Sequence, residues 1–276
     1  MLSLSTATFP SSAADLQRLL NEALDRSFIS KSEPVTVSDH AYPRVSGIQI
    51  SLDEARLRPD PPRPPIVAGE VSPALEIEQL TLSASPLFLG SAGVNLSGSA
   101  REVHLAQGKD SNGQLVLSID KVANGQMEIS IAHAELEAVI TELAQTKGAT
   151  QGITINNLQL KLQEKSPRAV SAEVQFRVRK LILSASIRVT GQIDLDDELN
   201  LKVSGLACSG EGGTAALVCG LLKPYLQKVD GREFPLMSLP LGKIQLRDVR
   251  LTVGERLTVF AEFGSAAQSA PPASQI

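Results

Sequence analysis

Residues 205–222, GLACSGEGGTAALVCGLL, carry a spacing that could bind a nucleotide. Gly210, Gly212 and Ala215 form a G-x-G-x-x-A pattern between an expected strand and an expected helix. In dinucleotide-binding proteins, such glycines let the backbone approach a pyrophosphate at a helix N-terminus. That fold also needs alternating parallel β-α-β units, whereas the neighbouring sequence predicts hairpins. We therefore interpret the segment as a glycine-rich turn that caps a helix, and we expect no cofactor.

The acidic residues Asp194, Asp196, Asp197 and Glu198 place four carboxylates within five positions. Paired carboxylates can perform acid–base chemistry or hold Ca²⁺. These residues also lie where a hairpin must turn, and Asp favours turns because its side chain bonds the nearby backbone. We interpret the cluster as a solvated turn, with a weak calcium site and catalysis as alternatives.

Histidine and cysteine residues do not form a recognisable ligand set. His40, His104 and His133 lie far apart and lack zinc-site spacing, and His133 is expected at the surface or as a helix cap. The sequence has no G-x-S-x-G or H-E-x-x-H motif. A catalytic triad assembled from distant residues stays open as an alternative, because triads are defined by geometry and need no local motif. Cys208 and Cys219 are expected to be free buried thiols rather than a bridge, because no signal sequence is evident. The sequence therefore predicts neither catalytic nor metal-binding residues.

A basic cluster lies in VQFRVRKLIL, where Arg177, Arg179 and Lys180 follow one another closely. Arg177 and Arg179 share a strand face opposite Phe176 and Val178, because successive side chains of a strand alternate between faces. We expect a solvated outer face; contact with anionic lipid headgroups is the alternative.

Composition limits the classes of function. The chain has 276 residues, of which 42% are hydrophobic and 20% charged, so it can bury a substantial core. A net charge of −4, an aromatic content of 3% and the absence of Trp disfavour nucleic-acid binding. The first residues, MLSLSTATFPSSAADLQ, lack a signal-peptide pattern, and no apolar run approaches the roughly 20 residues that span a bilayer. We expect a soluble cytoplasmic protein, unless a signal was removed, and leave peripheral membrane association open.

Three helices are predicted from apolar residues at helical spacing, over residues 12–28, 133–146 and 214–229. Gly148 is the expected stop of the second helix. The third helix has a broad apolar face that includes Leu217, Leu221 and Tyr225, and Pro224 should kink it. A helix that is apolar over so wide an arc is expected to be buried on more than one side.

Several predicted strands share an irregularity in which the apolar alternation slips by one residue. In ITINNLQLKL, Ile153 and Ile155 fall on one phase and Leu158, Leu160 and Leu162 on the other. A one-residue slip would turn every later side chain to solvent unless a bulge or a break absorbs it. We expect Asn156 and Asn157 to lie at a bulge or bend, with all five apolar residues facing inward. The same pattern occurs in LEIEQLTL, IQLRDVRLTV and ISLDEARL, and more weakly in FRVRKLIL.

The remaining segments predict an α+β fold. Strands LVLSIDK and QMEISIA flank a turn at residues 123–125, and IRVTGQIDL and LNLKVSGLA flank a turn at Asp196 and Asp197. Short hairpin turns favour an antiparallel sheet. The Pro-rich segment 58–73 is expected to be an extended linker or an edge crossing, and residues 265–276 a disordered tail. We expect one domain over residues 1–264.

Two longer segments resemble proteins of a known family. The C-terminal part, TAALVCGLLKPYLQKVDGREFPLMSLPLGKIQLRDVRLTVGERLTVFAEFG, has a helix, an L-P step at Leu239 and Pro240, and two final strands. The middle part, ISIAHAELEAVITELAQTKGATQGITINNLQLKL, has a strand, a helix entered through A-E-L and a slipped strand. Over residues 45–264 this order resembles the tubular lipid-binding superfamily, and within it the LmeA-like bacterial proteins. The resemblance implies a strongly curved, bulged antiparallel sheet wrapped around the long C-terminal helix, with a groove for lipid chains.

The sequence thus predicts a non-enzymatic protein that binds a lipid or another apolar small molecule. Transfer of this ligand is a further possible role. The residues expected to line the groove are apolar residues of the second and third helices: Leu136, Val139, Ile140, Leu143, Leu217, Leu221 and Tyr225. Aliphatic side chains suit flexible acyl chains, whose burial contributes about 25 cal/mol per Å². The alternative is a structural or assembly module whose own side chains fill the interior.

Overall fold

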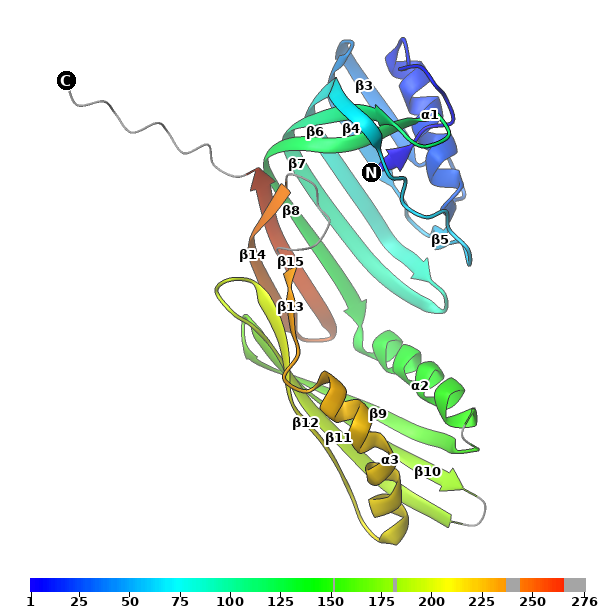
Figure 1. Ribbon diagram of the computed structural model, residues 1–276, viewed down its shortest axis with the longest axis vertical. Helices are drawn as coiled ribbons and strands as arrows, with labels where there is room; N and C mark the ends of the chain where they lie inside the picture. Colours follow the sequence, from blue (N-terminus) through cyan, green and yellow to red (C-terminus); the bar gives the residue numbers. More distant parts are fainter. Residues whose placement is uncertain (151, 181–182, 237–243, 266–276) are drawn as a thin grey trace, which may run out of the picture.

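The computed structural model describes residues 1–150, 152–180, 183–236 and 244–265. These residues form an α+β structure with two curved sheets at opposite ends of an elongated molecule (Figure 1). Helix α1 (Ala13–Asp25) lies on the larger sheet, and α2 (His133–Ala149) and α3 (Gly213–Val229) lie by the smaller one. The three helices agree with the predicted ranges to within a few residues.

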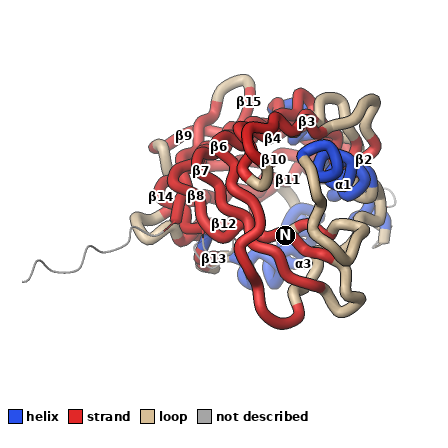
Figure 2. Tube along the Cα trace, turned by 90° about the horizontal axis from the view of Figure 1, so that it is seen from above, coloured by secondary structure: helices blue, strands red, loops and turns tan. Residues whose placement is uncertain are grey.

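The larger sheet has ten strands, and its main order is β14-β15-β8-β7-β6-β4-β3. Seen from above, these strands follow an arc, with α1 on its inner side (Figure 2). The strands are β1 (Leu2–Ser3), β2 (Phe28–Ile29), β3 (Val35–Ala41), β4 (Arg44–Ser51), β5 (Arg56–Leu57), β6 (Ala68–Leu89), β7 (Ala92–Lys109), β8 (Leu115–Ala132), β14 (Ile244–Val253) and β15 (Arg256–Ser265).

The smaller sheet has five antiparallel strands in the order β13-β12-β11-β10-β9. They are β9 (Thr154–Ser166), β10 (Ala169–Lys180), β11 (Leu183–Leu195), β12 (Asn200–Gly210) and β13 (Glu233–Pro235). The chain leaves the larger sheet after β8, builds the whole smaller sheet with its helices, and returns as the β14–β15 hairpin beside β8. The single sheet expected from the sequence is therefore two sheets, and α3 packs on β11 and β12 of the smaller one.

The prediction of antiparallel pairing holds for most strand pairs. The exceptions are β4–β6 and β5–β6, which are parallel, whereas β6 and β7 are antiparallel. Parallel neighbours need a long crossover connection. The Pro-rich segment provides it, because residues 58–67 carry no strand or helix and lead into β6 at Ala68. The expected linker thus ends inside the predicted 58–73 range, and the predicted tail lies outside the described residues except for Ser265, which ends β15.

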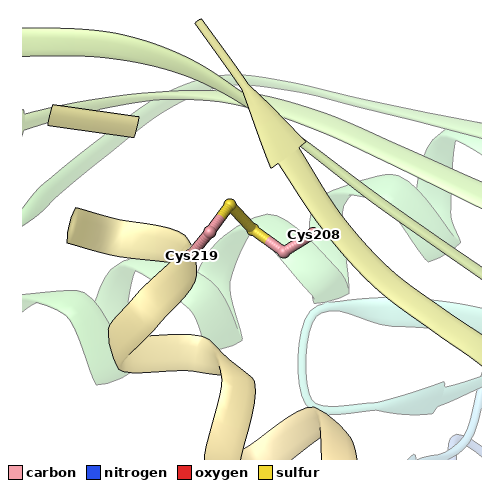
Figure 3. Close-up of a disulfide and its surroundings, with 2 residues drawn as sticks. All are labelled: Cys208 and Cys219. Atoms are coloured by element: carbon pink, nitrogen blue, oxygen red, sulfur yellow. A yellow bond between two sulfur atoms is a disulfide. The ribbon is translucent and has the colours of Figure 1, made fainter. Parts of the chain in front are cut away.

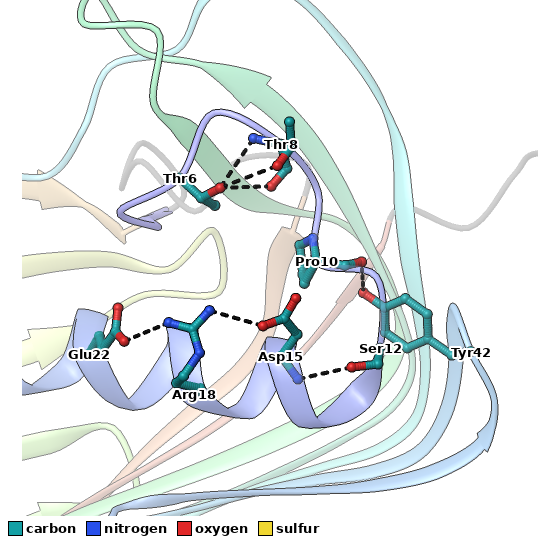
Figure 4. A network of polar contacts seen from close by, with 8 residues as sticks. All are labelled: Thr6, Thr8, Pro10, Ser12, Asp15, Arg18, Glu22 and Tyr42. Atoms are coloured by element: carbon teal, nitrogen blue, oxygen red, sulfur yellow. Dashed lines mark hydrogen bonds and ion pairs between the residues drawn. The ribbon is translucent and has the colours of Figure 1, made fainter.

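Helix α1 covers a closed core. Its buried face, with Leu16 fully buried, packs into a cluster that includes Val35, Val45 and Val103 from three strands. Ser12 caps the helix, since its Oγ accepts from the Asp15 N–H at 3.2 Å (Figure 4). On the exposed face, Arg18 pairs with Asp15 and with Glu22, one turn away on either side (Figure 4).

Two further polar contacts tie α1 to the sheet. Asn21 is 5% exposed, and its amide accepts from the Val35 N–H at 2.7 Å and donates to the Val35 carbonyl at 3.3 Å. Tyr42 donates its hydroxyl hydrogen to the Pro10 carbonyl at 2.7 Å (Figure 4), and burial raises the pKa of Tyr42 to about 12. Buried polar groups of this kind are paired, so Asn21 completes the backbone hydrogen bonds of the outer strand β3.

The predicted strand slips have different structural outcomes. At Asn157, where φ is +50°, the pairing of β9 with β10 shifts, and Leu158 and Leu160 beyond it stay buried. A second bulge lies at Arg247 between the paired positions Leu246 and Asp248. In ISLDEARL the slip is a break, because β4 ends at Ser51 and β5 begins at Arg56. These three outcomes confirm the prediction.

The other two slips are not bulges. In LEIEQLTL, β6 pairs without a register shift on both sides of Glu78, so Leu75 and Ile77 are buried whereas Leu80 and Leu82 are half-buried. In FRVRKLIL the phase changes where β10 ends and β11 begins, and residues 181–182 lie outside the described part of the chain.

The predicted turn at residues 123–125 was wrong, because β8 runs without interruption from Leu115 to Ala132. Asn124 and Gly125 pair with Arg101 and Ala100 of β7. A Cβ atom on Gly125 would lie 2.3 Å from the Phe263 ring. Glycine is therefore needed here for a close side-chain approach within a strand, and not for a turn.

The two sheets meet at a junction built around Arg168, at the start of β10. Its guanidinium donates to Asp197 and to Asp248, both at 2.8 Å. The hydrogen bond from Arg168 holds the pKa of Asp248 below its ordinary value. An apolar cluster of Leu195, Leu199 and Val249 lies at the same junction.

Candidate functional site

An apolar pocket lies between α2 and α3, above strands β9 and β10. Its volume is about 200 Å³, and Lys147 is the one charged residue in its lining. The lining residues are Ala144, Lys147, Gly148, Ile153, Ile155, Phe176, Val178, Val218, Leu221, Leu222 and Tyr225. Small-molecule sites are concave and mostly apolar, and this pocket fits that description although it is small.

The floor of the pocket follows from strand alternation and from the bulge. On β10, Phe176 and Val178 point toward the helices, while Arg177 and Arg179 point outward and are exposed. These two arginines are therefore on the outer face, as predicted; the side chain of Lys180, the third residue of the cluster, lies outside the described part of the structure. Ile155 on β9 and Ile153, just before it, complete the floor, and the bulge at Asn157 absorbs the change of phase that follows them.

Helix α2 forms one wall and is fixed to β9 by polar contacts. The His133 ring Nε2 lies 2.6 Å from the Leu160 carbonyl, so it carries the hydrogen and donates. Glu137 accepts from the Leu160 N–H at 2.8 Å, and Gln145 donates to the Ile155 carbonyl at 3.1 Å. His133, expected to be a surface or capping residue, is instead half-buried and anchors the start of α2.

Close approach of α2 to the floor depends on Gly148. A Cβ atom there would lie 2.8 Å from the Ile153 carbonyl oxygen and 3.1 Å from Ile155 Cδ1. Gly148 was predicted to stop the helix, but α2 continues through it to Ala149. The residue is conformationally ordinary here and is needed because it leaves room for the strand.

Helix α3 forms the other wall and is largely uncovered. Only Ala215 and Val218 are buried, and Leu217 and Tyr225 are 58% and 64% exposed. The expected burial of this helix on several sides was therefore wrong. Pro224 lies inside the continuous helix.

The residues predicted to line a groove divide into three groups. Leu221 and Tyr225 line the pocket. Leu143 and Leu217 are exposed and lie outside its lining. Three residues of α2 are half-buried and also lie outside the lining: Leu136, Val139 and Ile140. Sequence reasoning missed the floor of Ile153, Ile155, Phe176 and Val178. The signal was present, because inward-facing strand positions were identified in both segments but were not assigned to a ligand site.

The prediction of free thiols was wrong, because Cys208 and Cys219 form a disulfide (Figure 3). β12 ends at Gly210 and α3 begins at Gly213, so the helix folds directly back over the end of the strand. The two Cα atoms lie 5.4 Å apart, within the range that a disulfide requires. Disulfides persist in oxidising compartments, so this bond weighs against the expected cytoplasmic location.

The glycine pattern next to this bond is a strand-to-helix turn. Gly212 has φ +86° and precedes α3, and a Cβ on Gly210 would lie 2.5 Å from the Ser186 carbonyl oxygen and 2.8 Å from the Ala215 Cβ. The surrounding sheet is antiparallel, so the parallel units of a dinucleotide fold do not occur here.

The acidic cluster is also a turn, between β11 and β12. Asp196 accepts from the backbone N–H and the side-chain amide of Asn200, and the latter hydrogen bond lowers the pKa of Asp196. Asp197 pairs with Arg168. The histidines lie on β3, β7 and α2, and within the described ranges no group of His, Cys, Asp or Glu could hold a metal ion.

Larger hollows exist elsewhere but have more polar linings. One of about 780 Å³ lies between the N-terminal residues, the Pro-rich segment and the β7–β8 turn, and includes Arg26, Arg63 and Asp110. Another, of about 560 Å³, lies over Ser, Thr and Gln side chains of β3, β4 and β6. Of these three, the pocket between α2 and α3 has the most apolar lining.

Comparison with known proteins adds no assignment: no protein-family model, curated protein or solved structure matches this chain. In the part of the chain that the structure describes, no helix is long and apolar enough to cross a membrane.

Proposed function

We propose that this protein binds a lipid or another hydrophobic ligand, without catalysis, in the pocket between α2 and α3. The observation that carries the proposal is an apolar pocket whose floor is formed by Ile155, Phe176 and Val178 and whose α3 wall continues into exposed apolar side chains. Soluble proteins expose contiguous apolar patches chiefly where something binds.

The volume of the pocket is sufficient for only one end of an acyl chain. At about 30 Å³ per water-sized group, 200 Å³ holds roughly six or seven methylene-sized groups. Burying them contributes about 5 kcal/mol before the cost of association. The remainder of an acyl chain would lie across Leu217, Leu221 and Tyr225, whose side chains are 58%, 46% and 64% exposed.

The positive charges of the pocket lining and of α3 favour an anionic headgroup or membrane surface, whereas α2 also carries Glu135, Glu137 and Glu142. Lys147 lines the pocket, and α3 carries Lys223 and Lys228 but no acidic residue. Peripheral contact with a membrane, through which a ligand enters or leaves, is therefore part of the proposal. Cosedimentation with vesicles of phosphatidylcholine, with and without phosphatidylserine, tests this contact, and binding that ignores the anionic lipid would remove it.

A pocket-filling variant tests ligand binding. Ala144→Leu should fill the space between α2 and the floor and weaken uptake of cis-parinaric acid, a fluorescent fatty acid, by about tenfold or more. The matched control is Ala138→Leu, an exposed position of the same helix outside the lining. Native mass spectrometry and lipid extraction of the purified protein should also find a copurifying lipid. Equal uptake by both variants, or no uptake and no lipid in the parent, would reject the proposal.

The second candidate is an assembly module in which a protein partner, and not a ligand, covers α3. The exposure of Leu217 and Tyr225 favours it, because protein interfaces also bury such side chains. Molar mass by light scattering distinguishes the two, since self-association that Leu217→Ser abolishes, in a protein that takes up no fatty acid, belongs to the second candidate.

A further inference from the structure

Noncovalent contacts hold α3 only lightly on its sheet. Ala215 and Val218 are its two buried residues, and Leu222 packs partly against the same apolar cluster. In the described part of the chain, no side chain of α3 makes a hydrogen bond or an ion pair. Helix α2, in contrast, has three side chains bonded to the backbone of β9.

The Cys208–Cys219 bond supplies the missing attachment at the middle of α3. Cys208 lies near the end of β12 and Cys219 is the seventh residue of α3 (Figure 3). Both are half-buried against Val178, Ala185 and Ile187. Cys219 directly follows Val218 and precedes Leu222 by three positions, and both of these residues line the pocket. The disulfide therefore fixes the part of α3 that forms the wall.

The ends of α3 are attached independently of this bond. Residues 211 and 212 connect it to β12, and beyond its C-terminal end Asp230 accepts from the Leu206 N–H at 3.0 Å. The Gly231 N–H donates to the Val203 carbonyl at 2.8 Å. Without the disulfide, α3 stays linked to β12 at both ends while its middle is released.

We infer that the Cys208–Cys219 disulfide is a redox clamp on the pocket, closed when oxidised and open when reduced. The inference rests on the proposed function for its ligand. Opening requires a dithiol reductant. Its first thiolate attacks one cysteine sulfur, which releases the other cysteine and forms a mixed disulfide. The second thiol of the reductant then attacks the reductant's own sulfur in this mixed disulfide and releases the first cysteine. Cys208 and Cys219 leave as two thiols, and the reductant leaves as a disulfide, so two electrons and two hydrogens are transferred.

Hydrogen exchange of the full chain tests the clamp directly. The oxidised protein, the protein reduced with dithiothreitol, and Cys208→Ser/Cys219→Ser are compared by mass spectrometry. Amides of α3 should exchange faster by about tenfold or more in the last two, and those of α2 by less than about twofold. Dithiothreitol should have no effect on the double variant. Unchanged exchange in α3, or an equal rise in α2 and α3, would overturn the inference.

The release rate of cis-parinaric acid connects the clamp to the ligand. Dissociation should be faster by about threefold or more from the reduced protein and from the double variant. If the release rate does not depend on redox state although the amides of α3 exchange faster after reduction, the disulfide does not control ligand release, and this part of the inference is overturned. If no state takes up the fatty acid, the proposed function fails, and the exchange of α3 alone decides whether the clamp exists.

Discussion

Helices α1 and α3 are both rich in apolar residues, yet the molecule uses them in opposite ways. Six of the 13 residues of α1 are buried, against two of the 17 residues of α3. The apolar residues of α1 fall on one stripe, so a single sheet face can cover them. Those of α3 are spread around the helix, and the smaller sheet fully buries only Ala215 and Val218 among them.

The difference teaches that apolar content does not by itself predict burial. Around α1, fifteen buried residues form one core cluster, whereas the cluster beneath α3 has five. The larger sheet with α1 is therefore stabilised by packing. The α3 region has little packing, a covalent bond and exposed apolar side chains, which is the combination expected where a wall must move or bind.

The largest effect should come from the core around α1. Leu16→Ala removes a fully buried side chain and should lower the free energy of unfolding by about 3 kcal/mol. Leu217→Ala, on the exposed face of α3, should change it by less than about 0.5 kcal/mol. Urea denaturation of the two variants measures both, and similar losses would contradict the contrast between the helices.

Loss of the disulfide should have the next largest effect. Cys208→Ser/Cys219→Ser removes a bridge between residues 11 positions apart and should destabilise the protein by about 2–3 kcal/mol. Calorimetry should show the loss in the transition of the smaller sheet. A shift in the unfolding of the α1 region instead would contradict the view that this bond serves α3.

Removing the polar attachment of α1 should cost somewhat less. Asn21→Ala leaves the Val35 N–H and carbonyl without their side-chain partner and should cost about 2 kcal/mol in urea denaturation. Arg18→Ala is the control at an exposed position of α1 and should be close to neutral, because exposed ion pairs contribute little. Equal effects would show that Asn21 is not structurally required.

The smallest effect concerns the junction between the two regions. Asp248→Asn breaks the pairing with Arg168 and should cost below about 1 kcal/mol at neutral pH. Because the folded-state pKa of Asp248 lies below its ordinary value of 3.8, its stabilisation is complete above that value. It is lost as pH falls through the folded-state pKa. The difference between parent and variant should therefore be constant from pH 7 to about pH 4 and shrink as the pH falls further. A difference that stays constant in acid would contradict the assigned role of the ion pair.

Local patterns predicted much of the secondary structure. Helical spacing located all three helices, and the slips at Asn157 and Arg247 located two bulges, because a period-two pattern cannot change phase without an extra residue. The pattern failed at Gly125 and Gly148. Both glycines resemble turn or stop signals. Gly125 instead leaves room for the ring of Phe263, from a distant part of the sequence, and Gly148 leaves room for Ile153 and Ile155 of the segment that follows the helix.

The sequence predicted the apolar character of the candidate site but not the full set of residues that line it. Leu221 and Tyr225 were identified because they lie on an apolar helix, whereas the floor was missed because no local signal says which strand lies beneath which helix. The same limit explains Cys208 and Cys219. Two cysteines in one segment do not indicate whether the helix folds back far enough to join them.

The sequence by itself determined where the chain forms helices and strands, and which face of most strands is apolar, since these depend on residues within a few positions of one another. Only the tertiary structure decided that the strands divide into two sheets, that α3 stays largely uncovered, and that a disulfide holds it. The division into sheets and the exposure of α3 depend on contacts between segments far apart in the chain, where side-chain size and close approach, and not periodicity, select the arrangement. The disulfide depends on how α3 folds back over the end of β12.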